Sequence, residues 1–374
     1  MSNPHLHIVA FNIPYPANYG GVIDVYYKIA ALHAEGVQVH LHCFEYGRKR
    51  ADELNAICAS VNYYPRSAMW KGFLSDKPFI VQSRDAVALL KNLKKDDYPI
   101  LFEGLHCCYF LAHSDLMHRR KWVRMHNNEP AYYLHLGQNE KRFFNKIYFF
   151  AEYRRLMKFE WVLSNAEKIW CISPQETNYY QHKYPQTSYL AAFNGHKQVS
   201  GLPGRGSYIL YHGNLEVNEN KEAAMFLVNE IFSKCTLPLI IAGNKPDQNL
   251  IAAASKFKHI TIVANPTEAA LSELMKNAHI HYLPTFQTTG IKLKLLNALY
   301  NGRFCVVNQN MVQDTGLETC CHLANSPQQA IDVLTALMQE EFTSSEISKR
   351  QTVLQQFSDT TEVKKITRLL KSLH

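Results

Sequence analysis

The chain has 374 residues, of which 47% are hydrophobic and 19% are charged, a balance that excludes a disordered chain and suits two globular domains with substantial cores. It contains neither an apolar run of about eighteen residues nor a signal-peptide core, so we expect a cytoplasmic protein whose nine cysteines, without CxxC spacing, stay thiols. The formal net charge of +8 favours anionic ligands or an anionic membrane face, whereas nucleic acid is disfavoured because zinc-finger spacing and RNA-binding aromatic signatures are missing.

The first predicted unit alternates strand and helix. A strand is expected at residues 7–11, a loop at 14–21, a helix at 22–34 that Gly36 ends, and a strand at 37–44. Gly20 and Gly21 allow a ligand to approach the backbone at the carboxyl end of the first strand, which is where open α/β sheets bind ligands.

Polar residues follow a later strand of the same half. Helices are predicted at residues 52–59 and 85–93, and strands at 99–102 and 122–125. The last of these strands carries His126, Asn127, Asn128 and Glu129 to its carboxyl end. One histidine among eighteen is most often structural, so this pattern alone leaves the role of His126 open.

Residues 139–163 predict one long helix with broad apolar stripes and six basic residues between them. The favoured interpretation is a core helix with a solvated flank. The alternative is a helix that lies on a membrane surface, because its basic and aromatic residues alternate.

The end of the first domain is marked by composition. A strand at 166–172 is followed by a helix that Ser173 caps, with Pro174 at its first position and Glu176 in its first turn. Residues 196–206 are rich in Gly, Ser and Pro and predict a linker. We therefore expect domains at 1–195 and 207–357, and a final helix at 358–374, opened by a capping box, that returns to the first domain.

The second domain repeats the alternation of strand and helix. A strand at 208–211 precedes Gly213 and Asn214, and a helix at 221–232 begins with Lys221. Further strands at 238–242 and 260–264 are followed by Gly243 and Asn265, and a helix is expected at 267–277.

Residues 279–307 read as one strand, helix and strand. The strands are 280–283 and 304–307, the helix is 291–300, and Gly302 is expected to be the left-handed residue that ends it. The loop before the helix contains Thr288, Thr289 and Gly290. A helix start favours an anion, yet Lys292 lies in its first turn, and a bound phosphate would resolve this conflict. The alternative is that Lys292 and Lys294 are ordinary solvated lysines.

Residues 284–307 resemble the donor-binding motif of retaining nucleotide-sugar glycosyltransferases of family 4, in the variant P-x-x-x-G-x-G-I-K-x-K-x-L-E-A-L-x-x-G-x-P-V-V. Four other segments resemble parts of that family. PYPANYGG resembles its P-x-x-G-G loop, and HNNE resembles its H-N-x-E segment. AAFNG resembles the segment that ends its first domain, and YHGNL resembles its V-G-x-L turn. The resemblance implies an α/β GT-B fold, with two Rossmann-like doubly wound domains facing a cleft.

The resemblance also implies roles for individual residues. His126, Lys221 and Lys292 would be catalytic, and Asn127 and Glu129 would lie on the acceptor side. The implied donor site comprises Gly20, Gly21, Gly213, Asn214, Gly243, Asn265, Thr288, Thr289, Gly290, Ile291 and Asn297. Three residues depart from the family pattern: Asn297 and Thr289 stand at usually acidic positions, and Asn214 at an arginine position.

The function implied is transfer of a sugar, with retention, from a nucleotide diphosphate sugar to a glycan, lipid-linked or protein acceptor, as in surface polysaccharide synthesis. We expect no cofactor and no metal, because no DxD pair follows a strand and Asp96 and Asp97 look solvated. Peripheral contact with the inner membrane surface fits such an acceptor. The departures leave two alternatives: an inactive GT-B subunit that supports a partner, and a GT-B sugar-nucleotide epimerase.

Overall fold

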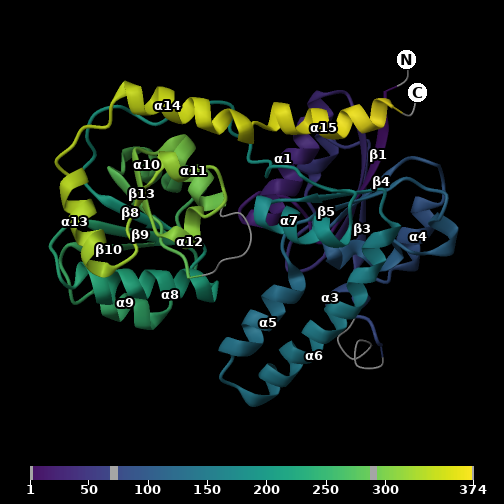
Figure 1. Ribbon diagram of the computed structural model, residues 1–374, viewed down its shortest axis with the longest axis horizontal. Coiled ribbons are helices and arrows are strands. Elements are labelled where there is room, and N and C mark those ends of the chain that lie inside the picture. Colours follow the sequence, from purple (N-terminus) through teal and green to yellow (C-terminus); the bar gives the residue numbers. More distant parts are fainter. Residues whose placement is uncertain (1–2, 68–74, 287–292, 373–374) are drawn as a thin grey trace. The chain divides into compact units, whose positions relative to one another are not determined.

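The computed structural model describes residues 3–67, 75–286 and 293–372 (Figure 1). The chain divides into two compact units. The first unit holds the described residues up to Phe193 together with the last helix, α15 (Asp359–Lys371), and the second holds the described residues between Asn194 and Ser358. Within the described part of the chain, each helix is too short or too polar to cross a lipid bilayer.

The first unit is built on a parallel sheet of seven strands in the order β3-β2-β1-β4-β5-β6-β7. The strands are β1 (His5–Ala10), β2 (Gln38–Glu45), β3 (Ser60–Pro65), β4 (Ile100–Glu103), β5 (Lys121–Met125), β6 (Lys168–Cys171) and β7 (Thr187–Tyr189). The strand order reverses direction between β1 and β4. This reversal makes a topological switch point, where the loops at the carboxyl ends diverge and leave room for a ligand.

Helices cover both faces of this sheet because alternate residues of each strand point to opposite faces. Leu6 and Ile8 of β1 belong to a core that includes residues of α1 (Gly20–Ala34) and α15, which lie side by side (Figure 1). Val9, the residue after Ile8, points to the other face of the sheet and belongs to the opposite core with residues of α4 (Val87–Leu93) and α6 (Phe143–Phe159). The remaining helices of this unit are α3 (Phe79–Gln82), α5 (Glu129–Asn139) and α7 (Pro174–Lys183).

Four histidines of β1 and β2 interrupt this apolar alternation. His7 pairs in register with His40, and its ring Nδ1 lies 2.9 Å from Nε2 of His42, which in turn contacts the Tyr64 hydroxyl at 2.8 Å. The other ring nitrogen of His7 is 2.9 Å from Asp96 Oδ1. Burial lowers the pKa of His7 to about 4 and holds that of His42 well below its usual range. His7 and His42 are therefore neutral at physiological pH.

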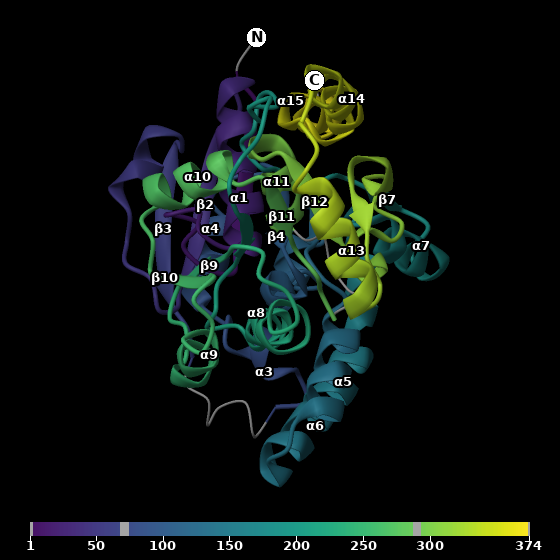
Figure 2. The same ribbon diagram turned by 90° about the vertical axis from the view of Figure 1, so that its left-hand side faces the viewer.

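The helix predicted at 139–163 is present as α6 but is shorter, Phe143–Phe159, and the helix before it, α5, was not predicted. Two antiparallel helices, α5 and α6, form a hairpin that projects from the sheet, and a 3-10 turn at Glu160–Asn165 follows α6 (Figures 1 and 2). Asn128 caps α5, since its side chain accepts a hydrogen bond from the Ala131 amide. Gly137 of α5 lies against Phe149 and Phe150 of α6, where a Cβ would be at an ordinary contact distance of 3.4 Å from both side chains.

Other predicted boundaries differ less. The helix expected at 52–59 is a 3-10 helix, Asp52–Ala56, and the one expected at 85–93 begins at Val87. The cap at Ser173 is confirmed, since its hydroxyl accepts from the Glu176 amide, and Gly36 ends α1 with a φ of 81°.

The second unit contains a parallel sheet of six strands in the order β10-β9-β8-β11-β12-β13. The strands are β8 (Ile209–His212), β9 (Leu239–Gly243), β10 (Ile260–Ala264), β11 (Ile280–Tyr282), β12 (Phe304–Val307) and β13 (His322–Leu323). The helices are α8 (Asn218–Phe226), α9 (Gln248–Ala254), α10 (Glu268–Asn277), α11 (Leu293–Asn301), α12 (Gln309–Val312), α13 (Pro327–Leu337) and α14 (Ser344–Leu354). The order reverses between β8 and β11, so both units are doubly wound, which confirms the predicted fold class.

Gly302 does not have the left-handed backbone that was expected of it, since it is not among the glycines with positive φ. Glycine is needed at this position for a steric reason instead. A Cβ at this position would lie 2.0 Å from Nε2 of the buried His281 ring. The end of α11 therefore requires glycine because His281 packs against it.

Candidate functional site

Charged side chains meet beside the switch point of the first sheet. We call Asp24, Lys28, Glu103, Arg124 and His126 the buried charge cluster. Lys28 Nζ lies 2.9 Å from Asp24 Oδ2 and 2.9 Å from Glu103 Oε1, and all three side chains are fully buried. Arg124 Nη2 lies 2.9 Å from Asp24 Oδ1. Two buried carboxylates thus face two buried cations, and this balance is what makes their burial tolerable.

His126 is held by the acidic members of this cluster. Its Nε2 lies 2.7 Å from Glu103 Oε2, and its Nδ1 lies 3.8 Å from Asp24 Oδ2. Burial works against ionisation of Glu103, but Lys28 and the His126 hydrogen bond outweigh it and lower the pKa of the Glu103 carboxyl. Because that carboxylate can only accept, Nε2 of His126 carries the proton and donates it. The ring is therefore oriented from within the protein.

Asp24, Glu103 and His126 are the only group of three or more possible metal ligands that lie close together among the described residues. The space between the two carboxylates is taken by the Lys28 ammonium group, which contacts both of them. A cation could bind there only by displacing a buried lysine. The cluster is thus better described as an ion-pair network than as a metal site.

Glu129 and its neighbours form a second buried polar group at the carboxyl end of β5. Burial, and next the repulsion from Glu176, raise the pKa of Glu129 to about 8, so its carboxyl is protonated at pH 7. His106 Nε2 lies 3.8 Å from Glu129 Oε1, and burial also holds the pKa of His106 well below its usual range. The Phe11 ring contacts both His106 and His126, with ring centroids 5.7 and 5.4 Å apart. This edge of the sheet thus holds neutral groups next to charged ones.

Asn127 adds a polar atom to this region. Its Oδ1 is buried and has no hydrogen-bond partner among the described residues. An amide oxygen in that position can accept a hydrogen bond from a bound hydroxyl group.

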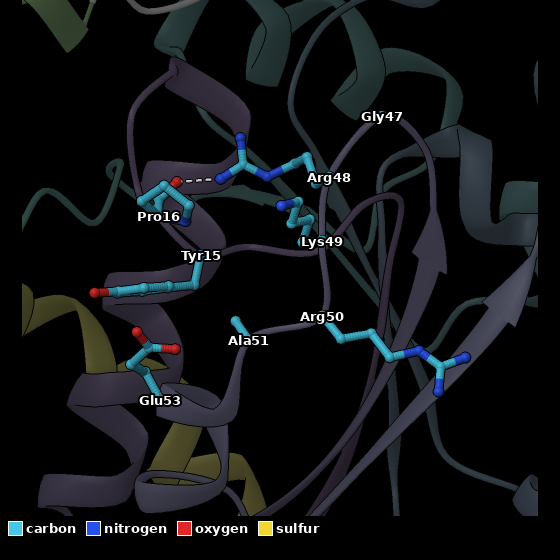
Figure 3. A pocket seen from close by; sticks show the side chains of 8 residues that line it. All are labelled: Tyr15, Pro16, Gly47, Arg48, Lys49, Arg50, Ala51 and Glu53. Carbon is cyan, nitrogen blue, oxygen red and sulfur yellow. Dashed lines mark hydrogen bonds between the residues drawn. The ribbon is translucent and has the colours of Figure 1, made fainter.

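A hollow of about 400 Å³ lies at the carboxyl end of β2 (Figure 3). It is lined by Tyr15, Pro16, Gly47, Arg48, Lys49, Arg50, Ala51 and Glu53. Arg48 and Lys49 point towards the loop of Pro16, whereas Arg50 points away and pairs with Glu45 at 2.7 Å (Figure 3). The sequence reasoning missed this hollow, although the basic run at 48–50 directly after a strand was a usable signal.

Gly20 and Gly21 were expected in a loop but form the first turn of α1. A Cβ on Gly21 would lie 2.7 Å from Cζ of Phe11, so glycine here lets that ring pack against the helix start. The close approach predicted at this position is made, within the described structure, by the protein's own side chain.

In the second unit, the predicted glycines and asparagines meet at the carboxyl ends of β8 and β9. Gly213 follows β8, and its carbonyl oxygen would lie 2.0 Å from a Cβ on Gly243. Asn265 has a φ of 52°, donates its amide hydrogen to the Gly243 carbonyl at 2.9 Å, and accepts from the Lys245 amide. The Asn214 side chain accepts from the Glu216 amide at 3.1 Å. These four residues therefore build one tight turn region.

Beside that turn, lysines and polar groups lie at the starts of the helices that follow β8, β9 and β11. Lys221 Nζ lies 3.8 Å from Asp247 Oδ2. Lys294 Nζ donates to Asn220 Oδ1 at 3.0 Å and lies 5.3 Å above the centroid of the Tyr211 ring. The sequence predicted Lys294 only as a solvated residue and gave no role to Asn220. The two residues are 74 positions apart, so no local pattern in the sequence indicates their contact.

Glu219 and Asn308 both form hydrogen bonds with Thr285, which follows β11. The Thr285 hydroxyl is hydrogen-bonded to the Glu219 carboxylate. The Asn308 amide group accepts from the Thr285 amide at 3.0 Å and donates to its carbonyl at 2.6 Å. The segment that enters the predicted phosphate loop is thus fixed from both sides.

The centre of the predicted donor loop, Thr288, Thr289, Gly290, Ile291 and Lys292, lies outside the described residues. Asn297, in α11, is described. Its amide nitrogen lies 3.5 Å from Sδ of Met275, and its side-chain oxygen accepts from Asn301 at 2.7 Å. It also hydrogen-bonds His196, whose ring stacks on Tyr300 at 4.6 Å.

Comparison with known proteins finds a family model and a curated relative that match the sequence. Residues 206–340 match the family model described as glycosyl transferases group 1. An uncharacterized 44.6 kDa protein in the cps region of Klebsiella pneumoniae is 27% identical over 330 residues, covering 83% of this chain and 84% of the relative.

Solved structures agree over nearly the whole chain. TarM has a TM-score of 0.69 at 9% identity and covers 99% of this chain and 99% of its own. The Arabidopsis thaliana UGT89C1, complexed with UDP-L-rhamnose, has a TM-score of 0.59 at 10% identity, over 99% of this chain and 100% of its own. At such low identity the likeness concerns the fold. The chain has the GT-B fold, and residues 206–340 in its second unit match the model of the group 1 glycosyl transferases.

Proposed function

We propose that this protein transfers a sugar from a nucleotide diphosphate sugar to a glycan or lipid-linked acceptor, with retention of configuration. The observation that carries the proposal is the group 1 match over the unit in which Lys221, Lys294 and their polar neighbours lie at the helix starts that follow the strands. Ligands of doubly wound sheets bind at switch points. Two further supports are the nucleotide sugar bound to the Arabidopsis neighbour and the cps region of the Klebsiella relative, which favours a polysaccharide product.

In the proposed reaction the second unit binds the donor. Lys221 and Lys294 would offer positive charge to the diphosphate, together with Lys292 and the amides of the loop before α11. Transfer needs stabilisation of the charge that develops on the leaving phosphate, and preorganised cations provide it without reorganisation. Asn297 would bind the ribose hydroxyls through a neutral hydrogen bond, which is weaker than the one a carboxylate makes.

The first unit would receive the acceptor near the carboxyl ends of β4 and β5. His126 would face the transferred sugar or the acceptor as an oriented ring, because both of its nitrogens lie near buried carboxylates. It would therefore position reactants rather than exchange protons with them, and the departing phosphate would take the acceptor proton. Asn127 and the protonated Glu129 would offer hydrogen bonds on the acceptor side.

The carboxylates near both switch points support a metal-independent reaction, because other side chains already engage them. In the first unit, the carboxylates Asp24 and Glu103 are engaged by Lys28. In the second, Asp247 faces Lys221, and Glu219 is hydrogen-bonded to Thr285. We therefore expect turnover to survive excess chelator, and abolished turnover that added Mg²⁺ restores would contradict this part.

The hollow at Arg48 and Lys49 would accept an anionic part of the acceptor, such as a lipid-linked phosphate or an acidic sugar. Replacing Lys49 by Ala should raise the KM for a charged acceptor and leave the KM for the donor unchanged. Lys91, exposed on α4, provides the matched Lys→Ala control.

The test of the main proposal is a thermal-shift screen with UDP-, GDP- and ADP-sugars, followed by hydrolysis and transfer assays with any sugar that binds. Lys292→Ala and Lys221→Ala should weaken nucleotide binding by roughly tenfold each, since each removes a charge-assisted contact. Proton NMR of the product reports whether the anomeric configuration is retained. Binding without any effect of either lysine would remove the proposed phosphate site.

One observation favours a second function, that of an inactive GT-B subunit which supports a partner enzyme. Asn297 stands where the family has a glutamate, and its side chain is engaged by Asn301. Calorimetry separates the two functions, because a chain that binds no nucleotide cannot be the transferase. Restoring the acid by Asn297→Glu should then increase nucleotide affinity only if the rest of the donor site is intact.

A further inference from the structure

Helix α6 exposes several large apolar side chains on its outward face. Phe144 is 83% exposed, Phe143 69%, Ile147 51% and Trp161, in the following 3-10 turn, 60%. Phe144, Ile147, Ala151, Arg154, Lys158 and Trp161 recur at intervals of three and four residues, so they share one stripe of the helix. We call this stripe, together with Phe143, the outer face of α6.

The fold of the hairpin does not need this face. Helices α5 and α6 pack through their opposite sides, where the rings of Tyr133 and Phe149 meet at 6.1 Å and Gly137 contacts Phe149 and Phe150. A monomeric protein rarely leaves a row of large apolar side chains in water without a use for it.

The outer face is flanked by unpaired positive charge. Lys141, Arg142, Lys146, Arg154 and Lys158 form no ion pair with any residue that the structure describes, and four of them lie on or next to the apolar stripe. Glu140 is the acid of the intervening turn, and it accepts from the Arg142 amide at 2.8 Å and from Asn145 at 3.2 Å. Apolar and cationic groups thus occupy the same exposed surface.

We propose that the outer face of α6 docks on an anionic lipid bilayer. A helix with exposed aromatic residues and lysines or arginines beside them can lie in the interface, with its rings among the acyl chains and its cations on the headgroups. The hairpin end projects away from the sheet of its unit (Figures 1 and 2). The unpaired cations provide charge complementarity to anionic headgroups.

The bilayer is favoured over a protein or nucleic-acid partner for two reasons. Phe143 and Phe144 are exposed at the start of α6, whereas protein docking through helices typically uses a groove to receive such side chains. The cations are spread along about 25 Å of helix with apolar residues between them, a pattern that fits an interface plane better than the backbone of a nucleic acid. The inference does not depend on whether the chain transfers a sugar.

The test is flotation of the full-length protein with two kinds of vesicle, phosphatidylcholine alone and a phosphatidylcholine–phosphatidylglycerol mixture. We expect binding to the anionic vesicles, weaker binding at high salt, and a blue shift of tryptophan fluorescence that Trp161→Phe abolishes. Phe144→Ser should lower the partition coefficient roughly tenfold, and Lys158→Glu about fivefold or more.

Matched controls keep the inference falsifiable. Met117 and Val87 are 72% and 65% exposed in the same unit, so Met117→Ser and Val87→Ser remove comparable apolar surface elsewhere and should not change binding. The inference is overturned if the wild type ignores anionic vesicles, if the controls lose as much binding as Phe144→Ser, or if the protein binds heparin or nucleic acid through α6 but not vesicles. Nucleotide affinity measured on the same variants shows separately whether the donor site is intact.

Discussion

Removing the Lys28 ammonium group should destabilise the first unit strongly. Lys28→Met keeps the aliphatic volume but leaves Asp24 and Glu103, both fully buried, without the cation that lies 2.9 Å from each. Breaking a buried ion pair by deleting one partner costs ~3–5 kcal/mol, and here two carboxylates lose a partner at once. We therefore expect a loss near the upper end of that range, which is a large part of a domain's total stability.

Tryptophan fluorescence measures this loss in the right unit. Trp122, Trp161 and Trp170 belong to the first unit, and the residues from 194 onward contain no tryptophan. Urea unfolding followed by fluorescence thus isolates its transition, and a loss of this size should lower the midpoint by roughly 1.5 M. The control is Lys91→Met, an exposed lysine on α4, which should stay within about 0.5 kcal/mol of the wild type.

A second variant tests the electrostatic reason. Glu103→Gln added to Lys28→Met removes the unpaired charge, so the double variant should regain part of the lost stability. The pH dependence has a definite sign. Without Lys28, burial should raise the folded pKa of Glu103 above its ordinary value of 4.5, so the deficit should be smallest at acid pH and grow as the pH rises. A loss below about 1 kcal/mol, or a deficit that is independent of pH, would refute the charge-balance argument.

Three further predictions concern other buried groups. Because burial lowers the pKa of His7 from 6.5 to about 4, stability should be complete above pH 6.5 and fall by roughly 3 kcal/mol towards pH 4, and His7→Gln should flatten this fall in urea titrations. The pKa of Glu129 is raised from 4.5 to about 8, so the wild type should lose folding stability as the pH rises through that range and the buried carboxyl must ionise. Glu129→Gln should therefore be more stable than the wild type above pH 8. Gly243→Ala places a methyl group 2.0 Å from the Gly213 carbonyl and should lower the melting temperature of the second unit by circular dichroism, whereas unchanged melting would contradict the turn geometry.

The alternation of strand and helix was sufficient to predict the two doubly wound units, because parallel strands buried on both faces read as short apolar runs. The helix predicted at 139–163 is α6, which begins four residues later, and the break that separates it from α5 was missed for a physical reason. The break at residues 140–142 contains neither proline nor glycine and follows from the packing of α5 against α6, a tertiary contact. Gly302 shows the same limit, since the need for glycine comes from His281, which is distant in sequence.

The candidate site was predicted in part. His126, Asn127 and Glu129 could be found because they stand together after one strand. Asp24 and Arg124 were missed, since they are 100 residues apart and only the sheet brings them together. A local signal did exist for Asp24 and Lys28. They are four residues apart on the same inward stripe of α1 as Val25 and Ile29, and an acid and a base on an apolar stripe indicate a buried pair.

Two carboxyl groups near the same sheet edge are held in opposite protonation states, and this bears on what the first unit can do. Glu103 is kept ionised by Lys28 and His126, so it fixes a ring but cannot donate. Burial and the repulsion from Glu176 keep Glu129 largely protonated at pH 7, so it can donate a hydrogen bond. With Glu103 held by its partners and Glu129 able to donate, the first unit is suited to orienting an acceptor hydroxyl group. In the proposed transfer, the departing phosphate of the donor would then take the acceptor proton.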